Sequence, residues 1–459
     1  MSTDNVTLFG RPIDRRTLLT LTGKTLAGGA VAGLWLSPEL ATFVDAAARG
    51  RATGGAITVM NTFSPNVAKW KAYYSAFTKE TGIKVNFDDQ NYNNQYQKIT
   101  TQGQSGTHGD DVVAIDTIWA GSFGAAGFTL DLTDFLSTAL KQQMTTPALD
   151  SVSYKGRMYG VPFWNSAKHF FYNKKMLDAV GLRQPPATLD ALLAYCAVLK
   201  NNRAKLGIEY PMSWSWPQKE ALTCDYVQMI DALGGRFFAT DNVTPVFNRG
   251  VGVTALQLMK SMLDKGYAAP GSLTHQESDV ANDLLTGKIA MSTNWEGTMS
   301  ASLDPSQASK AVLGQIRMAL IPGSRARKSG SCLGPEGYAI MKSSQQQAAA
   351  KAFVNWQVGT QAQKGAMLNF DQPPVYREMY TDTALRRLTQ RTDGQDDFAI
   401  YGQQFIYAQP RPNFPGYLDA SKRLQVHLHK AFLGQETAQQ ALDAAVAEMK
   451  AASGGGNNP

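Results

Sequence analysis

The sequence predicts an α/β fold in which mostly parallel sheets are covered by helices. Three observations support this prediction. Strand-like and helix-like segments alternate from residue 56 to residue 116, and the alternation returns from residue 188 onward. The chain has 459 residues, of which 43% are hydrophobic, so it can fill more than one core. Charged residues make up 18% and form no long block of one sign, which is typical of a folded chain.

The first predicted core begins with a buried strand at Ile57–Met60, followed by a helix. Ser64 and Pro65 predict the cap and the first turn of this helix. Its apolar face is formed by residues at helical spacing: Val67, Trp70, Tyr74 and Phe77. Gly82 predicts the end of the helix. We therefore expect Trp70 to be a core residue.

Two further strands, at 83–87 and 111–115, complete a strand–helix–strand–helix–strand order. This order predicts neighbouring parallel strands with helices on the faces of the sheet. Ligands of such sheets bind at the carboxyl ends of the strands. The loops that begin at Asn61, Asp88 and Asp116 are therefore candidate binding loops.

The second half of the chain repeats the alternation. Helices are predicted at 188–200, 218–233, 251–265, 345–358 and 437–451, and short strands at 289–291 and 338–341. Thr437 and Gln440 predict a capping box at the start of the last helix. Residues 453–459 are polar and rich in glycine, so we expect a disordered tail.

Residues 1–48 predict an export signal. A charged stretch precedes an apolar stretch at 25–36, and small residues suited to signal peptidase follow. The apolar stretch is too short to span a membrane. Arg15 and Arg16 resemble a twin-arginine signal, although Asp14 stands where Ser or Thr is usual. We therefore expect an exported, soluble, periplasmic protein.

Charge and cysteine content exclude several classes. The net charge is +7, but the basic residues are scattered, so we expect no nucleic-acid partner. No C-x-x-C pair occurs and the five histidines lack metal-ligand spacing, so we expect no metal and no cofactor. Cys196 either is a buried thiol or pairs with Cys224 in an oxidising compartment.

Six short segments stand in an informative order along the chain: Phe77–Val85, Gly109–Val113, Tyr154–Pro162, Phe171–Lys174, Pro185–Asp190 and Leu285–Met291. None of them is specific alone. Together they resemble the extracellular sugar-type solute-binding proteins related to maltose-binding protein. The resemblance extends from about residue 56 to residue 450.

The resemblance implies a two-lobe periplasmic-binding-protein fold whose lobes close on a ligand about a hinge. It places lobe 1 at 56–165 and 322–370, and lobe 2 at 166–321 and 371–452. It also implies a monomeric receptor of an ABC importer, which delivers a sugar or sugar alcohol to a membrane permease.

A sugar presents apolar C–H faces and a rim of hydroxyls, so its site needs aromatic planes and planar polar groups. Such residues follow the predicted strands or lie near the implied crossings between lobes: Asn61, Phe63, Tyr92, Gln95, Asp116, Trp119, Trp164, Asn165, Trp214, Trp216, Trp295, Glu296 and Arg411. The family often places an aromatic ligand contact where Trp295 stands. Trp214 and Trp216 lie in a turn-like segment and look exposed, although tryptophans in such a turn also cover cores.

Two other classes of function are alternatives to a sugar receptor. A glycoside-processing enzyme would use two carboxylates, for which Asp116 and Glu296 are candidates. The sequence contains no nucleophile elbow, zinc-protease motif or P-loop, so we do not expect an enzyme. The same fold could bind a phosphorylated polyol, a polyamine or ferric ion. The polar candidates are mostly neutral, which favours a neutral polyhydroxylated ligand.

Overall fold

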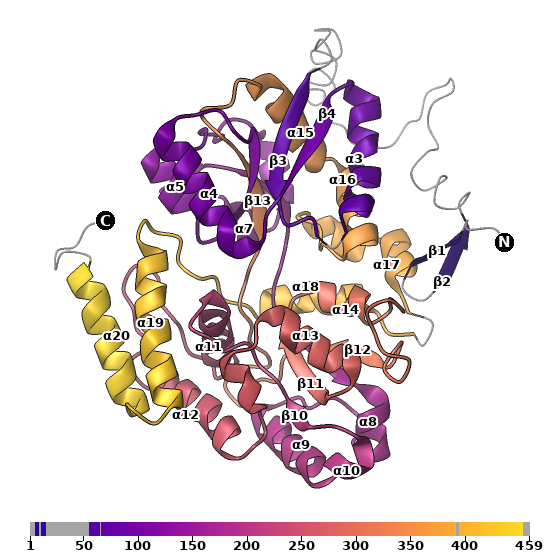
Figure 1. The fold of residues 1–459 in the computed structure, drawn as a ribbon, viewed down its shortest axis with the longest axis vertical. Helices are drawn as coiled ribbons and strands as arrows, with labels where there is room; N and C mark the ends of the chain where they lie inside the picture. The colour runs from indigo at the N-terminus through magenta and orange to yellow at the C-terminus, as the bar shows by residue number, and fades with distance from the viewer. Residues whose placement is uncertain (1–4, 9–10, 15–54, 65, 392–393, 453–459) are drawn as a thin grey trace. The chain divides into compact units, whose positions relative to one another are not determined.

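The computed structural model describes residues 5–8, 11–14, 55–64, 66–391 and 394–452. The predicted twin-arginine pair with its apolar stretch, and the predicted tail at 453–459, lie outside these residues. The chain divides into two compact units. Unit 1 contains the chain up to Asn165 and Pro335–Leu388, and unit 2 contains Ser166–Gly334 and the chain from Thr389 onward. Both units combine sheets with helices, as the α/β prediction requires (Figure 1).

Unit 1 is built on a five-stranded sheet with the strand order β4-β3-β5-β13-β8. Its strands are β3 (Ala56–Asn61), β4 (Lys84–Asp89), β5 (Val112–Asp116), β8 (Val161–Trp164) and β13 (Glu336–Ile340). The pairing of β3 with β4 and with β5 is parallel, which confirms the predicted order. β13 runs antiparallel to β5 and β8. The ends of β3, β5 and β8 and the start of β13 therefore share one edge of the sheet.

Helices cover both faces of this sheet. They are α3 (Val67–Thr81), α4 (Tyr92–Ser105), α5 (Ala120–Ala126), α6 (Thr138–Gln143), α7 (Thr146–Ser151), α15 (Gln347–Gln357), α16 (Thr360–Phe370) and α17 (Thr383–Thr389), with a 3-10 turn at Arg377–Thr381. In Figure 1, α3, α15 and α16 lie on one side of the sheet, and α4 and α5 lie on the other. Trp70 of α3 stacks on Phe370 of α16 with 3.7 Å between the ring centroids, so its predicted place in the core is confirmed. Two short antiparallel pairs form separate two-stranded sheets: β1 (Asn5–Leu8) with β2 (Arg11–Asp14), and β6 (Ser153–Tyr154) with β7 (Arg157–Met158).

The loop from β3 to α3 differs in one detail from the prediction. α3 ends at Gly82, whose φ of 74° is the left-handed conformation that ends helices, as expected. Its N-cap, however, is Asn66 and not Ser64. The Ser64 hydroxyl donates to the Asp89 carboxylate on β4, which also accepts the Phe63 N–H at 2.8 Å. Asp89 therefore ties this loop to the neighbouring strand.

Unit 2 is built on a four-stranded sheet with the order β10-β11-β9-β12. Its strands are β9 (His169–Asn173), β10 (Tyr210–Met212), β11 (Ile289–Asn294) and β12 (Ile316–Ala319). β10 and β11 are parallel, whereas β9 runs antiparallel to β11 and β12. β13 is the antiparallel strand of the unit 1 sheet, and it is the first strand after the chain returns from unit 2 to unit 1. β9 is the antiparallel strand of the unit 2 sheet, and it is the first strand after the chain passes from unit 1 to unit 2.

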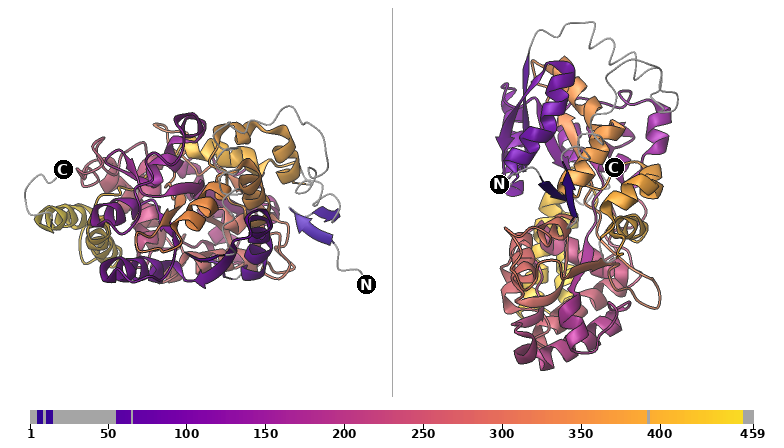
Figure 2. Two further views of the ribbon diagram at one scale, coloured as in Figure 1. Left: turned by 90° about the horizontal axis from the view of Figure 1, so that it is seen from above. Right: turned by 90° about the vertical axis from the view of Figure 1, so that its right-hand side faces the viewer.

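The helices of unit 2 are α8 (Lys174–Ala179), α9 (Leu189–Asn201), α10 (Arg203–Leu206), α11 (Glu220–Ala232), α12 (Val251–Asp264), α13 (Glu277–Thr286), α14 (Gly297–Ala301), α18 (Asp397–Ile406), α19 (Tyr417–Phe432) and α20 (Ala438–Ala452), with a 3-10 turn at Pro270–Leu273. α19 and α20 lie side by side in Figures 1 and 2. His427 of α19 contacts both Glu436 and Glu448, at 2.8 and 3.2 Å, and so joins the two helices.

Two of the expected lobe boundaries are corrected by the structure. Residues 322–334 belong to unit 2, because Gly323 accepts the Leu189 N–H at 2.7 Å and the segment stays on this unit after β12. Residues 371–388 belong to unit 1, because Pro373 accepts the Asn165 N–H at 2.8 Å. The second and third crossings between the units therefore lie further along the chain than expected.

The cysteines are free thiols, so the disulfide between Cys196 and Cys224 that the sequence left open is not formed. Cys196 is fully buried within unit 2, which agrees with the other interpretation. Cys224 lies beside Cys332 rather than beside Cys196.

Helix α11 carries acidic residues into the interior of unit 2. Asp231 is 1% exposed, and its carboxylate accepts from Arg327 Nη2 at 3.3 Å, the Gln409 amide at 2.7 Å and the Ser331 N–H at 3.0 Å. Burial raises the pKa of Asp231, although these donors oppose the change. One carboxylate therefore holds three separate segments together.

We expect Asp231→Ala to lower the free energy of unfolding by about 3 kcal/mol, because several donors lose their shared acceptor. Urea denaturation of the full chain measures this loss. Asp264→Ala is the matched control: its side chain is 57% exposed and pairs with Lys260, so the loss should stay below about 1 kcal/mol. Equal losses in the two variants would contradict the role given to Asp231.

Candidate ligand-binding site

The carboxyl edge of the unit 1 sheet brings four predicted site residues together. Asp116 ends β5, Trp164 ends β8 and Tyr92 begins α4. The Tyr92 hydroxyl donates to the Asp116 carboxylate, and its ring stacks on Trp119 with 5.1 Å between centroids and 28° between planes. Glu336, at the start of β13, pairs in register with Asp116 on one side and Trp164 on the other. The sequence analysis missed Glu336, because only strand register places it here.

The aromatic residues of this edge differ in exposure. Tyr92 is the outer ring, 36% exposed, whereas Trp119 beneath it is 2% exposed. Within the described residues, the buried indole N–H groups of Trp119 and Trp164 have no hydrogen-bond partner. A buried donor without an acceptor costs about 1–3 kcal/mol. These N–H groups are therefore two donors whose hydrogen-bonding capacity is not used by the described residues.

Phe63 does not lie on this edge. Its side chain is fully buried, and its ring contacts those of Phe87 and Trp70 at centroid distances of 4.6 and 5.7 Å. The prediction that Phe63 stacks on a ligand is therefore corrected. An aromatic residue directly after a strand can turn back into the core, and Asp89 holds the Phe63 backbone in that position.

Three predicted amide side chains serve the fold of unit 1 instead. Asn61 donates to the Tyr338 hydroxyl at 2.8 Å and accepts the N–H of the next residue. Gln95 donates to the Thr62 hydroxyl at 2.8 Å. Asn165 donates to the Pro374 carbonyl at 2.9 Å. All three are at least 94% buried, so their hydrogen-bonding capacity is used within unit 1.

Trp295 is the predicted residue that the unit 2 edge presents. It follows β11, and its indole N–H donates to Glu277 Oε1 at 2.5 Å. Lys168 Nζ lies 5.5 Å from the ring centroid. A Cβ atom on Gly334 would lie 2.8 Å from the six-membered ring, closer than real contacts allow, so only glycine leaves the ring where it is. Three contacts therefore determine the plane of this ring.

Lys168 is a buried cation at the same edge. It directly precedes His169 of β9, which pairs with Asn294 at the end of β11. It is 1% exposed, with Nζ 2.5 Å from Asp225 and 3.7 Å from Glu277. Burial opposes its charge, but the two carboxylates prevail and raise the pKa of Lys168 above its usual value. Burial also raises the pKa of Asp225, to about 6, against the pull of Lys168. The sequence analysis missed all three residues, since nothing local connects them.

Glu296 has a different role from the one predicted. It is 2% exposed, and its two carboxylate oxygens accept from the Ala167 N–H at 2.7 Å and the Ser166 hydroxyl at 2.9 Å. His169 Nε2 lies 3.5 Å from the same carboxylate. Glu296 therefore secures the first residues of unit 2, and Glu277 is the carboxylate beside Trp295.

Trp214 and Trp216 are not exposed, as the sequence suggested, but 1% and 0% exposed. Their rings stack on each other at 5.2 Å, and Trp216 stacks on Phe432 at 5.0 Å. Arg411 pairs with Glu220 at 3.0 Å and is 4% exposed. The expectation that these three contact a ligand is replaced by roles in packing α11 and α19.

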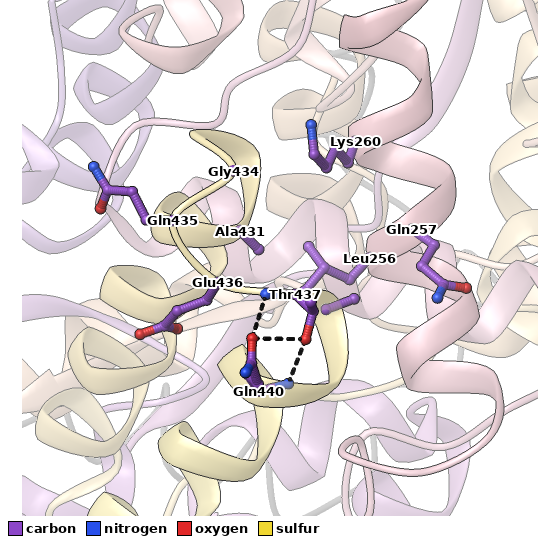
Figure 3. Close-up of a pocket in the computed structure, with 10 residues that line it drawn as sticks. Leu256, Gln257, Lys260, Ala431, Gly434, Gln435, Glu436, Thr437 and Gln440 are labelled. Atoms are coloured by element: carbon purple, nitrogen blue, oxygen red, sulfur yellow. Dashed lines mark hydrogen bonds between the residues drawn. The ribbon is translucent and has the colours of Figure 1, made fainter.

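Two surface cavities of unit 2 lie elsewhere. One, of about 330 Å³, lies where α12 meets the turn between α19 and α20 (Figure 3). On its rim, Thr437 and Gln440 form the predicted capping box, with N–H···O distances of 3.0 and 3.2 Å, and Glu436 pairs with Lys430. The other, of about 390 Å³, is lined by Asp231 and Arg327, which pair with each other. Glu436 at the first cavity and Asp231 at the second already pair with basic side chains of unit 2, so both cavities are weaker candidates than the two sheet edges.

The described residues contain no cluster of three His, Cys, Asp or Glu side chains able to hold a metal ion. None of the helices in the described part of the chain combines the length and apolar character that a membrane crossing needs.

A family model described as bacterial extracellular solute-binding protein matches residues 62–364, more than half of the chain. The chain belongs to this family. The resemblance inferred from the ordered segments is thus confirmed.

The curated relatives of the chain are named as binding proteins. A binding protein of Brucella abortus is 30% identical over 47% of this chain and 51% of its own length, so the match spans about half of that relative. An ABC transporter-binding protein of Deinococcus radiodurans is 23% identical, over 67% of this chain and 72% of its own. The mannitol-binding protein of Pseudomonas aeruginosa is 26% identical, over 57% of this chain and 58% of its own.

Solved structures confirm the predicted fold class. Maltose-bound MalE3 of T. maritima has a TM-score of 0.77 at 23% identity, covering 87% of this chain and 100% of that one. A ribitol-bound ABC transporter solute-binding protein of Agrobacterium radiobacter has a TM-score of 0.74 at 24% identity, covering 87% and 99%. At these identities the likeness establishes the two-lobe periplasmic-binding-protein fold.

Replacing Glu296 and Glu277 in turn tests the different roles assigned to these two carboxylates. We expect Glu296→Ala to reduce the free energy of unfolding by about 3 kcal/mol, because buried donors lose their acceptor. The Glu277 side chain is 35% exposed, so Glu277→Ala should lower the free energy of unfolding by about 1 kcal/mol. Guanidinium denaturation of both variants measures the difference. A larger loss for Glu277→Ala would show that the assignments are reversed.

Proposed function

We propose that the chain is the substrate-binding receptor of an ABC importer and that its ligand is a sugar or sugar alcohol. The observation that carries this proposal is the pairing of an aromatic ring with a carboxylate at the carboxyl edge of each sheet. Tyr92 pairs with Asp116 in unit 1, and Trp295 pairs with Glu277 in unit 2. A ring offers a plane for apolar C–H faces, and a carboxylate accepts from hydroxyls.

The relatives support this ligand class. One is a mannitol-binding protein, and similar structures hold maltose and ribitol. These ligands are neutral, and each combines C–H surface with many hydroxyls. The receptor passes its ligand to a membrane permease, binds no nucleic acid and acts as a monomer. We place it in the periplasm, exported through the twin-arginine-like signal that the sequence predicts.

The receptor acts by binding, without chemical change of the ligand. A glycosidase would require two carboxylates, for which Asp116 and Glu296 are the candidates in the sequence. Asp116 accepts from Tyr92, and Glu296 is committed to Ser166 and Ala167. This arrangement does not support their use as an acid and nucleophile pair.

A thermal-shift screen of the full chain tests the proposal with maltose, mannitol, ribitol, glycerol 3-phosphate and spermidine. A ligand at 100 times its Kd should stabilise the protein by about 2.7 kcal/mol and raise the Tm. We expect a sugar or alditol to give this shift and to be recovered unchanged.

Trp295→Ala should lower the affinity for that ligand by at least 10-fold, because the C–H face loses its platform. Trp356→Phe, a change in the aromatic packing of unit 1, is the control and should keep the affinity within about 2-fold. A ligand that is consumed, or a shift with spermidine alone, would overturn the proposal.

A further inference from the structure

Lys168 occupies the place that a cationic ligand would take beside Trp295. Its Nζ lies 5.5 Å from the indole centroid, 2.5 Å from Asp225 and 3.7 Å from Glu277. An ammonium group near an aromatic ring and between carboxylates is the arrangement by which proteins recognise amines. Here the ammonium belongs to the chain itself. A ligand amine would have to displace a cation that is 1% exposed and already paired.

The carboxylates of this cluster differ in what they can still bind. Asp225 is 1% exposed and is paired with Lys168. Glu296 has both oxygens occupied by Ser166 and Ala167. Glu277 is the outer member, with 35% of its side chain exposed. An anionic group that approached the Trp295 ring would therefore meet the Glu277 carboxylate first.

We propose that Lys168 and Glu277 together restrict the Trp295 subsite to uncharged, hydroxyl-bearing ligands. Lys168 acts as a built-in counter-ion that excludes amines, and Glu277 excludes phosphates and carboxylates while it accepts hydroxyls. The inference rests on the proposed function, since it assumes that Trp295 faces the ligand. It extends that function by naming two residues that select by charge.

The persistence of the ammonium supports this role. The carboxylates of Asp225 and Glu277 outweigh the burial that disfavours its charge and raise the pKa of Lys168. The Lys168 ammonium therefore keeps its charge throughout the physiological pH range.

Calorimetric titration of the full chain with mannitol, mannitol 1-phosphate and putrescine tests the inference. In Glu277→Gln, which keeps an acceptor oxygen for the indole, we expect the preference for mannitol over mannitol 1-phosphate to fall by at least 10-fold. Glu209→Gln removes a charge from an exposed position of the same unit and should leave this preference unchanged within 2-fold. A preference unchanged in Glu277→Gln would overturn the role of Glu277.

Lys168→Met removes the counter-ion but keeps an unbranched side chain that is one heavy atom shorter. We expect this variant to bind putrescine at least 10-fold more tightly than the wild type does, because Asp225 and Glu277 then lack a cation. Lys174→Met breaks the exposed pair with Asp178 and is the matched control. No gain for putrescine in a Lys168→Met protein that shows the wild-type circular-dichroism spectrum would overturn the role of Lys168.

The putrescine arm separates the two proposals. If the wild type binds no sugar or alditol but Lys168→Met gains putrescine, the exclusion of amines by Lys168 stands and the proposed function fails. If the wild type binds mannitol and neither variant changes its charge preference, the proposed function stands and this inference fails.

Discussion

Helix α11 can be buried because each of its inward-facing acids meets a base from another part of the chain. An unpaired carboxylate in a protein interior is penalised by several kcal/mol, so these contacts are a condition of the fold. Each acid pairs with a different segment: Glu220 with Arg411, Asp225 with Lys168 and Asp231 with Arg327. Ser166–Gly334 and the stretch from Thr389 onward, which make up unit 2, therefore both form ion pairs with α11.

The middle pair connects this interior to the candidate site. Asp225 holds Lys168, and Lys168 in turn lies near Glu277 and the Trp295 ring. The orientation of the ring is thus determined by residues that the fold requires in any case. Unit 1 reaches a similar result differently, because its outer ring, Tyr92, is held by a hydroxyl contact to Asp116 and by stacking on Trp119. For the ligand that we propose, a ring already held in place in each unit would reduce the ordering cost of binding.

Much of the fold follows from the sequence because its strands and helices have the expected periodicities. β3, β4 and β5, the end of α3 at Gly82 and the capping box of α20 are all local signals. The residues of the candidate site could be predicted from the sequence only in part. A polar or aromatic residue after a strand can face a ligand, or it can pack and form hydrogen bonds within the protein. Phe63 packs in the core, and Glu296 accepts a backbone hydrogen bond. Conversely, Glu277 and Lys168 meet through pairing of distant segments, which no local pattern encodes.

Gly334 touches Trp295 without being part of either sheet. Because any side chain at this position would push against the indole, a single substitution there would tilt the ring plane although Trp295 itself stayed the same. Two relatives could in this way share every candidate site residue and still hold this ring differently. A comparison of their sequences restricted to the site residues would overlook the change.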